Sequence, residues 1–342
     1  MKAMLLEHLQ QITPKSSPLR LAEIPVPVLK ADEVLIRVSV CGICHTELDE
    51  IEGRTPPENL PVIPGHQAVG VIVQLGSDVS KHKIGDRVGV AWIFSACGNC
   101  EHCVSGNENL CDRFKATGRD ANGGYAEYMK VSEDYAHPIP EFYKNEEAAP
   151  LLCAGAVGYR ALKLADIRNG EPLGLMGFGA SAHLVLKLVR HRLPKTQIYV
   201  FARREEERNF ALELGAAWTG NIEDEAPDKL YAIIDTTPVW KPVVESMKNL
   251  KKGGRLIINA IRKEDIDRQY LLNLSYKDHL WDEKEIKSVA NVTAADVREF
   301  LELAAQAQIR PHIQKYTLNQ ANKALIDLKF KKIRGAKVLV VG

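Results

Sequence analysis

A glycine-containing turn between a buried strand and a helix is the feature that most constrains how this chain can fold. The stretch PLGLM (172–176) is apolar, and GFGASAHLVLKLV follows it with the spacing G-x-G-x-x-A. Gly177 allows a tight turn, Gly179 lets a pyrophosphate approach the backbone, and Ala182 lets the helix pack closely on the strand. A strand before this motif and a helix after it predict a dinucleotide-binding unit.

From about Gly155 onward, short apolar runs alternate with longer amphipathic runs. Further strands are predicted in QIYVF (197–201), YAIID (231–235) and GRLIINAI (254–261). Between them we expect one helix closed by Gly215 and another closed by Gly253, because glycine commonly ends helices. Strands that alternate with helices predict an α/β fold with a doubly wound parallel sheet of the Rossmann type.

The composition excludes several classes of partner. The chain has 342 residues, 45% hydrophobic and 26% charged, which is typical of a globular protein with roughly two domains. A formal net charge of +1 predicts no partnership with nucleic acid or anionic lipid. There is no run of about 18 apolar residues to suggest a membrane span, and the first residues lack the features of a signal peptide. We therefore expect a cytoplasmic protein with reduced cysteines.

Four of the seven cysteines lie in one short polar loop, CGNCEHCVSGNENLC. Their spacing, C-x2-C-x2-C-x7-C, lets the thiolates surround one tetrahedral ion at about 2.3 Å. Four thiolates leave no open coordination position, so a zinc ion here is predicted to be structural. Loose thiols, disulfides and an iron–sulfur cluster are the alternatives. The ligands of this site would be Cys97, Cys100, Cys103 and Cys111.

Three other segments carry further candidate metal ligands. VSVCGICHTELDE contains Cys41 and Cys44, VIPGHQAVGVIVQLG contains His66, and APLLCAGAVGYRAL contains Cys153. Taken singly, a buried cysteine is more often a small core residue than a ligand. Together with GDRV, the four-cysteine loop and GGYAEY, in this order and spacing, these segments resemble the zinc-dependent alcohol dehydrogenases of the medium-chain dehydrogenase/reductase superfamily.

This resemblance implies an architecture and a reaction. Residues 1–153 and 294–342 would form a discontinuous, mostly β GroES-like catalytic domain, and residues 154–293 the cofactor domain. Cys44, His66 and Cys153 would bind the catalytic zinc, which gives two zinc ions per chain, and Cys41 would be a packing thiol. The enzyme would interconvert small-molecule alcohols and aldehydes or ketones by hydride transfer with NAD(P), as a homodimer or homotetramer joined through the cofactor domains.

The chemistry of these side chains agrees with that assignment. Two thiolates and one imidazole balance the charge of zinc and leave one coordination position open. Zinc alcohol dehydrogenases use this ligand set. Thr46 matches the family's proton-relay hydroxyl. Asp49 stands where the family often has a histidine, and a carboxylate with a pKa of about 3.9 suits neutral pH only if burial raises that value. Asp49 is therefore either a relay residue or a solvated loop acid.

Two neighbours of the ligands depart from the family pattern. Glu47 replaces the usual aspartate after the threonine, and it can still accept the ring N–H of His66. Gln67 replaces the usual glutamate after the histidine. Because an amide carries no charge, the substitution argues against a step in which this side chain becomes an anionic zinc ligand.

Aromatic residues near the loop are candidates for the substrate pocket. VGVAWIFSACG resembles the family segment whose aromatic side chains face the zinc, which points to Trp92 and Phe94. The alternative is that these side chains pack under the neighbouring loop.

The end of the second predicted strand should select the cofactor. In the family an acid at the position of Ala202 binds the adenine ribose of NAD, and here Arg203 and Arg204 follow the alanine. Guanidinium groups can bind a 2′-phosphate through paired hydrogen bonds. Alternatively, the arginines pair with the glutamates at 205–207. We favour NADP over NAD.

Other functions are compatible with parts of the sequence. A carbonyl reductase of the same superfamily is one alternative. A polyol dehydrogenase of the superfamily is another, although such enzymes often lack the four-cysteine loop that this chain keeps. A nucleotide-binding redox sensor without catalysis would not require Cys44, His66 and Cys153 together.

Overall fold

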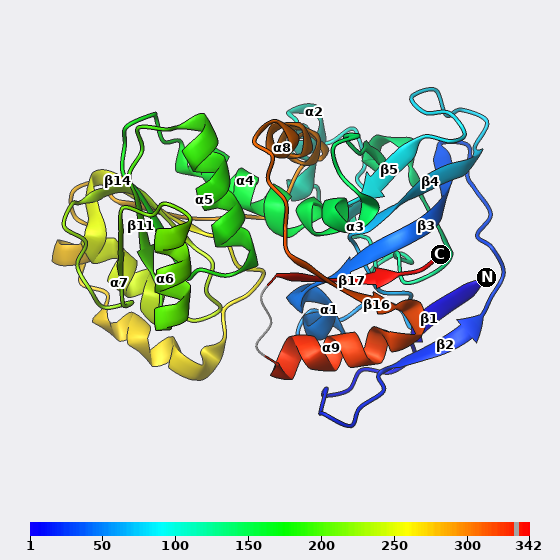
Figure 1. Ribbon diagram of the computed structural model, residues 1–342, viewed down its shortest axis with the longest axis horizontal. Helices are drawn as coiled ribbons and strands as arrows, with labels where there is room; N and C mark the ends of the chain where they lie inside the picture. The colour runs from blue at the N-terminus through cyan, green and yellow to red at the C-terminus, as the bar shows by residue number, and fades with distance from the viewer. Residues whose placement is uncertain (332–334) are drawn as a thin grey trace. The chain divides into compact units, whose positions relative to one another are not determined.

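The computed structural model describes residues 1–331 and 335–342, which form two units (Figure 1). The first unit contains Met1–Cys153, Val292–Ala305 and Arg310–Gly342. The second contains Ala154–Asn291 and Gln306–Ile309. The chain therefore leaves the first unit directly after Cys153 and returns to that unit at Val292. Within the described residues, no helix has the length and apolar character needed to cross a membrane.

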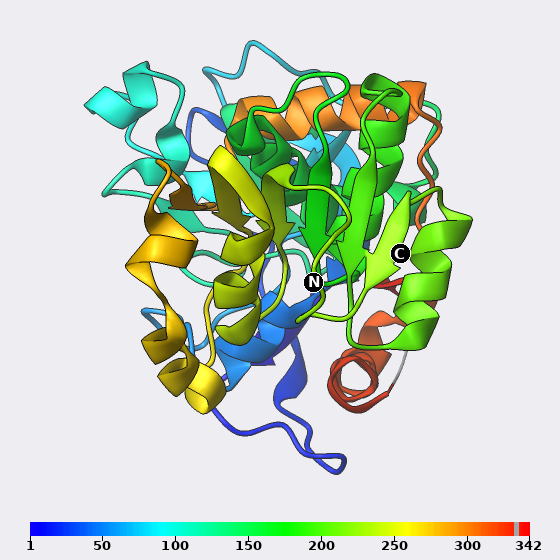
Figure 2. The ribbon, with the colours of Figure 1, turned by 90° about the vertical axis from the view of Figure 1, so that its left-hand side faces the viewer.

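The second unit is built on a parallel sheet, seen in green to yellow in Figure 2. Its strand order, β12-β11-β10-β13-β14-β15, is that of a doubly wound dinucleotide-binding fold, so this prediction is confirmed. The strands are β10 (Leu173–Met176), β11 (Ile198–Phe201), β12 (Trp218–Gly220), β13 (Leu230–Asp235), β14 (Leu250–Ile258) and β15 (Glu285–Ser288). The helical segments are α4 (Ala154–Ala165), α5 (Ala180–Arg192), α6 (Glu205–Glu213), α7 (Lys241–Asn249), the 3-10 segment η4 (Asp265–Asn273) and the π-helical segment η5 (Tyr276–Leu280).

One predicted helix is shorter than expected. The helix expected to end at Gly253 ends at Asn249 instead, and Leu250 already belongs to β14. The reason is pairing across the sheet, because Leu250 lies opposite Leu230 of β13. The helix expected to end at Gly215 behaves as predicted, since α6 ends at Glu213 and Gly215 follows with φ +95°.

The first unit is mostly antiparallel β structure. Its main sheet has the order β16-β17-β3-β4-β5-β9, and β8 pairs with β3. The strands of this unit are β1 (Lys2–Leu6), β2 (Leu19–Glu23), β3 (Glu33–Ile43), β4 (Ala68–Leu75), β5 (Arg87–Val90), β6 (Ile93–Ser95), β7 (Lys115–Ala116), β8 (Tyr128–Ser132), β9 (His137–Pro138), β16 (Ile313–Thr317) and β17 (Ala336–Val340). The helical segments are α1 (His45–Ile51), α2 (Glu101–Val104), η1 (Glu108–Leu110), η2 (Glu133–Tyr135), α3 (Asn145–Ala148), η3 (Ala149–Leu152), α8 (Ala294–Gln306), η6 (Leu318–Gln320) and α9 (Ala321–Phe330).

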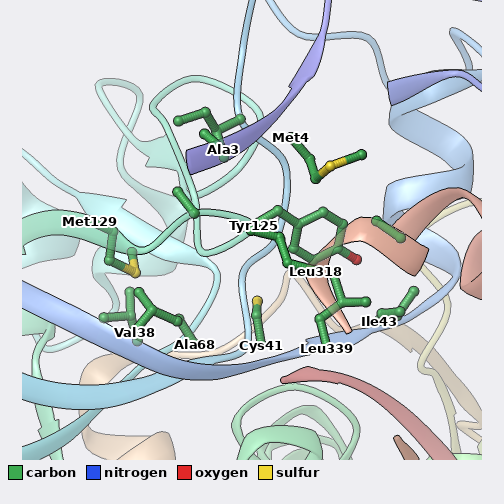
Figure 3. Packing of buried hydrophobic residues seen from close by; sticks show 14 of the residues in the cluster. Ala3, Met4, Val38, Cys41, Ile43, Ala68, Tyr125, Met129, Leu318 and Leu339 are labelled. Atoms are coloured by element: carbon green, nitrogen blue, oxygen red, sulfur yellow. The ribbon is translucent and has the colours of Figure 1, made fainter. Parts of the chain in front are cut away.

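An apolar core supports the strand that leads into the candidate metal site. Cys41 of β3 is fully buried in this core and lies near Tyr125 and Leu339 in Figure 3. A side chain at Gly65 would meet both the Tyr125 ring, at 2.4 Å, and the Cys41 sulfur, at 2.9 Å. This close packing, together with φ +100° at Gly65, explains why glycine precedes His66.

Candidate metal and cofactor sites

The first helix of the chain begins at a cysteine. Cys44 follows β3 in extended conformation and is the N-cap of α1. Its sulfur accepts the N–H of Thr46 at 3.4 Å, and Oε2 of Glu47 accepts the N–H of Cys44 at 2.8 Å. This reciprocal capping fixes the cysteine at the start of the helix and leaves its sulfur turned toward the other ligands.

Three candidate ligand atoms converge in the first unit. The Cys44 sulfur lies 3.5 Å from His66 Nε2 and 4.0 Å from the Cys153 sulfur. The separation between His66 Nε2 and the Cys153 sulfur is 3.4 Å. Tetrahedral zinc with sulfur ligands at about 2.3 Å requires sulfur atoms about 3.8 Å apart. The residues therefore fit a zinc ion with three protein ligands.

Glu47 connects two of these ligands. Its Oε1 lies 2.8 Å from Nδ1 of His66, and both side chains are almost completely buried. A carboxylate at this position selects the tautomer with the proton on Nδ1 and leaves Nε2 free for a metal ion. The structure thus brings Glu47 and His66 together in the arrangement expected from the sequence.

The buried Cys44 thiol needs a nearby cation in order to ionise. The pKa of Cys44 is raised well above its usual value by the hydrogen bond with Cys153 and by burial. Two neighbouring thiolates without a cation would repel each other in a desolvated site. A bound metal ion supplies the positive charge, and its binding should release protons.

Asp49 is part of an ion-pair cluster at the other end of α1. It is 4% exposed, and Oδ1 accepts a hydrogen bond from Nε of Arg54 at 2.5 Å. Arg54 also pairs with Glu52, which in turn pairs with Lys329 of α9. Asp49 is therefore buried in a helix, and the alternative of a solvated loop acid is wrong. Thr46 lies half-buried in the first turn of the same helix.

Gln67 packs against the strand that precedes α1. The residue is 3% exposed, and its backbone carbonyl accepts the N–H of Gly42 at 2.9 Å. A Cβ atom on Gly42 would lie 2.6 Å from Oε1 of Gln67. The amide thus occupies the space that a side chain on Gly42 would need.

The two aromatic pocket candidates have different surroundings. The Trp92 ring contacts the Phe114 ring, with centroids 5.1 Å apart, and the guanidinium of Arg119 lies 5.0 Å from the Trp92 ring. Phe94 of β6 is partly buried against the main apolar core of the unit. Both side chains therefore have packing partners within the protein.

The cysteine loop forms a second candidate metal site. Gly98 and Gly106 have φ of +75° and +72°, which lets the backbone curl around the sulfur atoms. The backbone N–H of Asn99 contributes most to lowering the pKa of Cys97, to about 5. The four sulfur atoms lie within 4.8 Å of one another and belong to Cys97, Cys100, Cys103 and Cys111.

The glycine motif of the second unit has the geometry that a pyrophosphate needs. Gly177 has φ +81°, and a Cβ there would lie 2.9 Å from Thr237 Cγ2. Gly179 is the N-cap of α5, and a Cβ atom on this glycine would have no other atom within 4 Å. Ala182 of that helix is fully buried. An anion is favoured at such a helix N-terminus.

The arginines after β11 are on the surface. Ala202 is 1% exposed, whereas Arg203 and Arg204 are exposed. Arg204 is the N-cap of α6, and its guanidinium lies 3.9 Å from Glu207. An exposed ion pair at this separation contributes little to stability, so the Arg204 guanidinium stays available for an anion.

Glu50 is a buried acid near the metal site that the sequence analysis did not single out. It is 1% exposed, and burial together with the charge of Glu47 raises the pKa of Glu50 to about 8. The spacing from Thr46 and Glu47, four and three residues, places it on the same helix face. That spacing was the available signal, but the sequence does not reveal how deeply the face is buried.

Comparison with known proteins identifies the family. Residues 30–141 match the alcohol dehydrogenase GroES-like domain. The chain is 40% identical over 331 residues to the probable alcohol dehydrogenase AdhA of Mycobacterium tuberculosis (strain CDC 1551 / Oshkosh), covering 95% of this chain and 94% of that protein. It is 33% identical over 330 residues to an alcohol dehydrogenase of Geobacillus stearothermophilus, covering 94% and 95%. The structure of a cinnamyl alcohol dehydrogenase, SbCAD4 from Sorghum bicolor, has a TM-score of 0.82 and 25% identity, covering 99% and 97%. With its two metal-ligand sets and its glycine turn, the chain belongs to the zinc-dependent alcohol dehydrogenase family of the medium-chain dehydrogenase/reductase superfamily.

Proposed function

We propose that the protein catalyses the interconversion of alcohols and aldehydes or ketones at the site formed by Cys44, His66 and Cys153. The observation that carries the proposal is the convergence of these three ligand atoms, each within 4.8 Å of the others. A zinc ion bound there supplies a Lewis acid that polarises the substrate oxygen. The nicotinamide cofactor supplies or accepts the hydride.

The side chains around this site have distinct tasks. Glu47 holds the His66 ring in the orientation that directs Nε2 toward the metal position. The Thr46 hydroxyl is the proposed first acceptor of the proton that leaves a substrate alcohol. Asp49 is engaged by Arg54, so we assign it to fixing α1 rather than to moving the proton. Trp92 and Phe94 remain candidates for the wall of the substrate pocket.

The test of this function compares two cysteines of the first unit. Cys153→Ser should abolish oxidation of a panel of alcohols and remove one zinc per chain, while circular dichroism stays unchanged. Cys41→Ala is the matched control, because Cys41 is buried in the core and outside the ligand set. Wild-type protein should contain two zinc ions per chain by elemental analysis. At most one tightly bound zinc, or full activity in Cys153→Ser, would refute the two-site proposal.

We infer further that the cofactor is NADP. Support comes from Ala202, which offers no carboxylate to an adenine ribose, and from the exposed Arg203 and Arg204 beside it. A charge-assisted contact to a 2′-phosphate is worth roughly 1.5–3 kcal/mol, about 10- to 150-fold in affinity. Fluorescence titration should therefore show tighter binding of NADPH than of NADH, and Ala202→Asp with Arg203→Gly should reverse the order. Equal affinities in the wild type would return the assignment to NAD.

A homodimer joined through the cofactor unit is the assembly that we propose. β15 is an edge strand, and all four of its residues are exposed. Ile286 on this strand is 40% exposed, and nearby Trp281 is 59% exposed. An exposed, partly apolar edge is a surface on which a second copy can extend the sheet. We also propose a cytoplasmic setting, which keeps the thiol ligands reduced, and assign residues 1–153 and 294–342 to catalysis and 154–293 to the cofactor.

A further inference from the structure

The loop after β11 is held by one arginine that lies outside the predicted cofactor motif. Nη1 of Arg208 donates hydrogen bonds to the carbonyl of Ala202 at 2.7 Å and to the carbonyl of Arg203 at 3.1 Å. The backbone N–H of Arg208 donates to the carbonyl of Arg204 at 3.2 Å. Arg208 thus binds three consecutive carbonyl groups, those of the residues proposed to select the cofactor.

The contacts of Arg208 determine how this loop presents its side chains. Ala202 is fixed on the other side as well, because its N–H donates to the carbonyl of Gly220 at 2.9 Å. The loop backbone is therefore restrained from both β12 and α6, whereas the side chains of Arg203 and Arg204 remain exposed. The exposed guanidinium groups lie at the start of α6, where the helix dipole also favours an anion.

We propose that Arg208 is a positioning residue for cofactor choice: it fixes the loop so that Arg203 and Arg204 meet a 2′-phosphate with little loss of backbone freedom. The inference rests on the proposed preference for NADP and extends it to a residue that the sequence pattern did not select. Ordering a loop on binding reduces affinity, and a loop that is ordered in advance avoids this cost. Arginine suits the task because the two N–H groups of Nη1 lie in the fixed plane of the guanidinium and reach both carbonyls. The ammonium group of lysine lies on a shorter, flexible stem without such a plane.

The proposal is tested with two ligands that differ only in the 2′-phosphate, adenosine 2′,5′-bisphosphate and 5′-AMP. Isothermal titration of the full-length, zinc-loaded protein gives the ratio of their affinities. We expect the wild type to bind the bisphosphate at least about tenfold more tightly. Arg208→Met and Arg208→Lys should each lower this ratio about fivefold or more. Methionine removes both carbonyl contacts, and the shorter, flexible stem of lysine does not hold both carbonyls in the same geometry. Their affinity for 5′-AMP should stay within about twofold of the wild type.

A matched control separates positioning from charge. Arg192→Met removes one exposed cation from the end of α5 in the same unit and should leave the ratio unchanged. An unchanged ratio in Arg208→Met would overturn the role of Arg208, and so would an unchanged ratio in Arg208→Lys, since charge alone would then suffice. Loss of 5′-AMP binding in either variant would show a purely structural role. A wild-type ratio near one would instead remove the NADP proposal on which the inference rests.

Discussion

Glu47 and Gln67 flank the candidate catalytic ligands, and they differ in what each can contribute. Glu47 is charged and touches two ligand residues, through the N–H of Cys44 and the ring of His66. Gln67 is neutral and packs on Gly42. Of these two residues, only Glu47 supports the candidate ligands with a negative charge. Gln67 instead packs against the strand β3.

This difference leads to a prediction for Gln67→Glu. The carboxylate has nearly the shape of the amide, so the packing on Gly42 should persist, and kcat should change by less than about tenfold, or about 1.4 kcal/mol. Steady-state kinetics with one good alcohol substrate measure the effect, with Gln67→Leu as the control for lost polarity. A rise in kcat of more than about tenfold would mean that the natural site is impaired.

A second residue-scale prediction concerns acid stability. His137 is 1% exposed, and burial, with a further contribution from the charge of Arg298, lowers the pKa of His137 to about 3. The unfolded chain takes up a proton near pH 6.5 that the folded protein accepts only near pH 3, so stability should fall as pH drops through this window. The slope from this one group is about 1.4 kcal/mol per pH unit.

Urea unfolding between pH 4 and pH 8 tests this expectation. His137→Gln should flatten the acid side of the stability profile, whereas His8→Gln, at an exposed histidine, should leave it unchanged. If all three proteins lose stability in parallel below pH 6.5, His137 is not the group responsible.

At the scale of an element, the cysteine loop is defined by the spacing of its four candidate metal ligands. Its short helix, α2, has four residues, none of them buried, so apolar packing contributes little to holding the loop. One further restraint is the N–H of Ala294, which donates to Oε1 of Glu108 at 2.6 Å. The loop should therefore depend on its metal ion for order.

We predict that Cys103→Ser lowers the melting temperature by about 5 °C or more, because a stability loss of about 2 kcal/mol or more is expected when a structural metal ligand is removed. The variant should keep the zinc bound by Cys44, His66 and Cys153, and with it most of the activity at low temperature. Differential scanning calorimetry and elemental analysis provide the readouts. An unchanged melting temperature with two zinc ions still bound would contradict the structural assignment.

The sequence predicted local features well and long-range features poorly. The glycine turn, the spacing of the cysteines and the doubly wound parallel sheet of the cofactor unit follow from patterns within a few residues or from their repetition. The end of α7 was misplaced because the pairing of Leu250 with Leu230 is a contact across the sheet. The burial of Glu50 and the carbonyl contacts of Arg208 likewise depend on neighbouring elements, and no local pattern encodes them.

At the scale of the whole molecule, the free edge at β15 provides a test of assembly. Ile286→Lys places a charge in the middle of the exposed strand and should convert a dimer to a monomer, because an unpaired charge opposes sheet extension. Light scattering measures the mass. Leu272→Lys is the control, since Leu272 is 88% exposed and lies in η4, outside the strand. The proposal is wrong if the wild type is a monomer, or if both variants keep the wild-type mass.

The discontinuity of the first unit has a consequence for synthesis. β3 lies in the middle of its sheet and pairs with β17, a strand close to the end of the chain. On the ribosome, Cys44, His66 and Cys153 are all present before any residue of the cofactor sheet is made, and so are two partners of β3, β4 and β8. The third partner, β17, is made only after that whole sheet and pairs with Val40–Ile43. Since domains generally fold as units during synthesis, the cofactor unit can finish folding first. Until β17 emerges, the end of β3 that leads to the metal site, Val40–Ile43, carries an open edge, and the nascent enzyme is exposed to misassembly there.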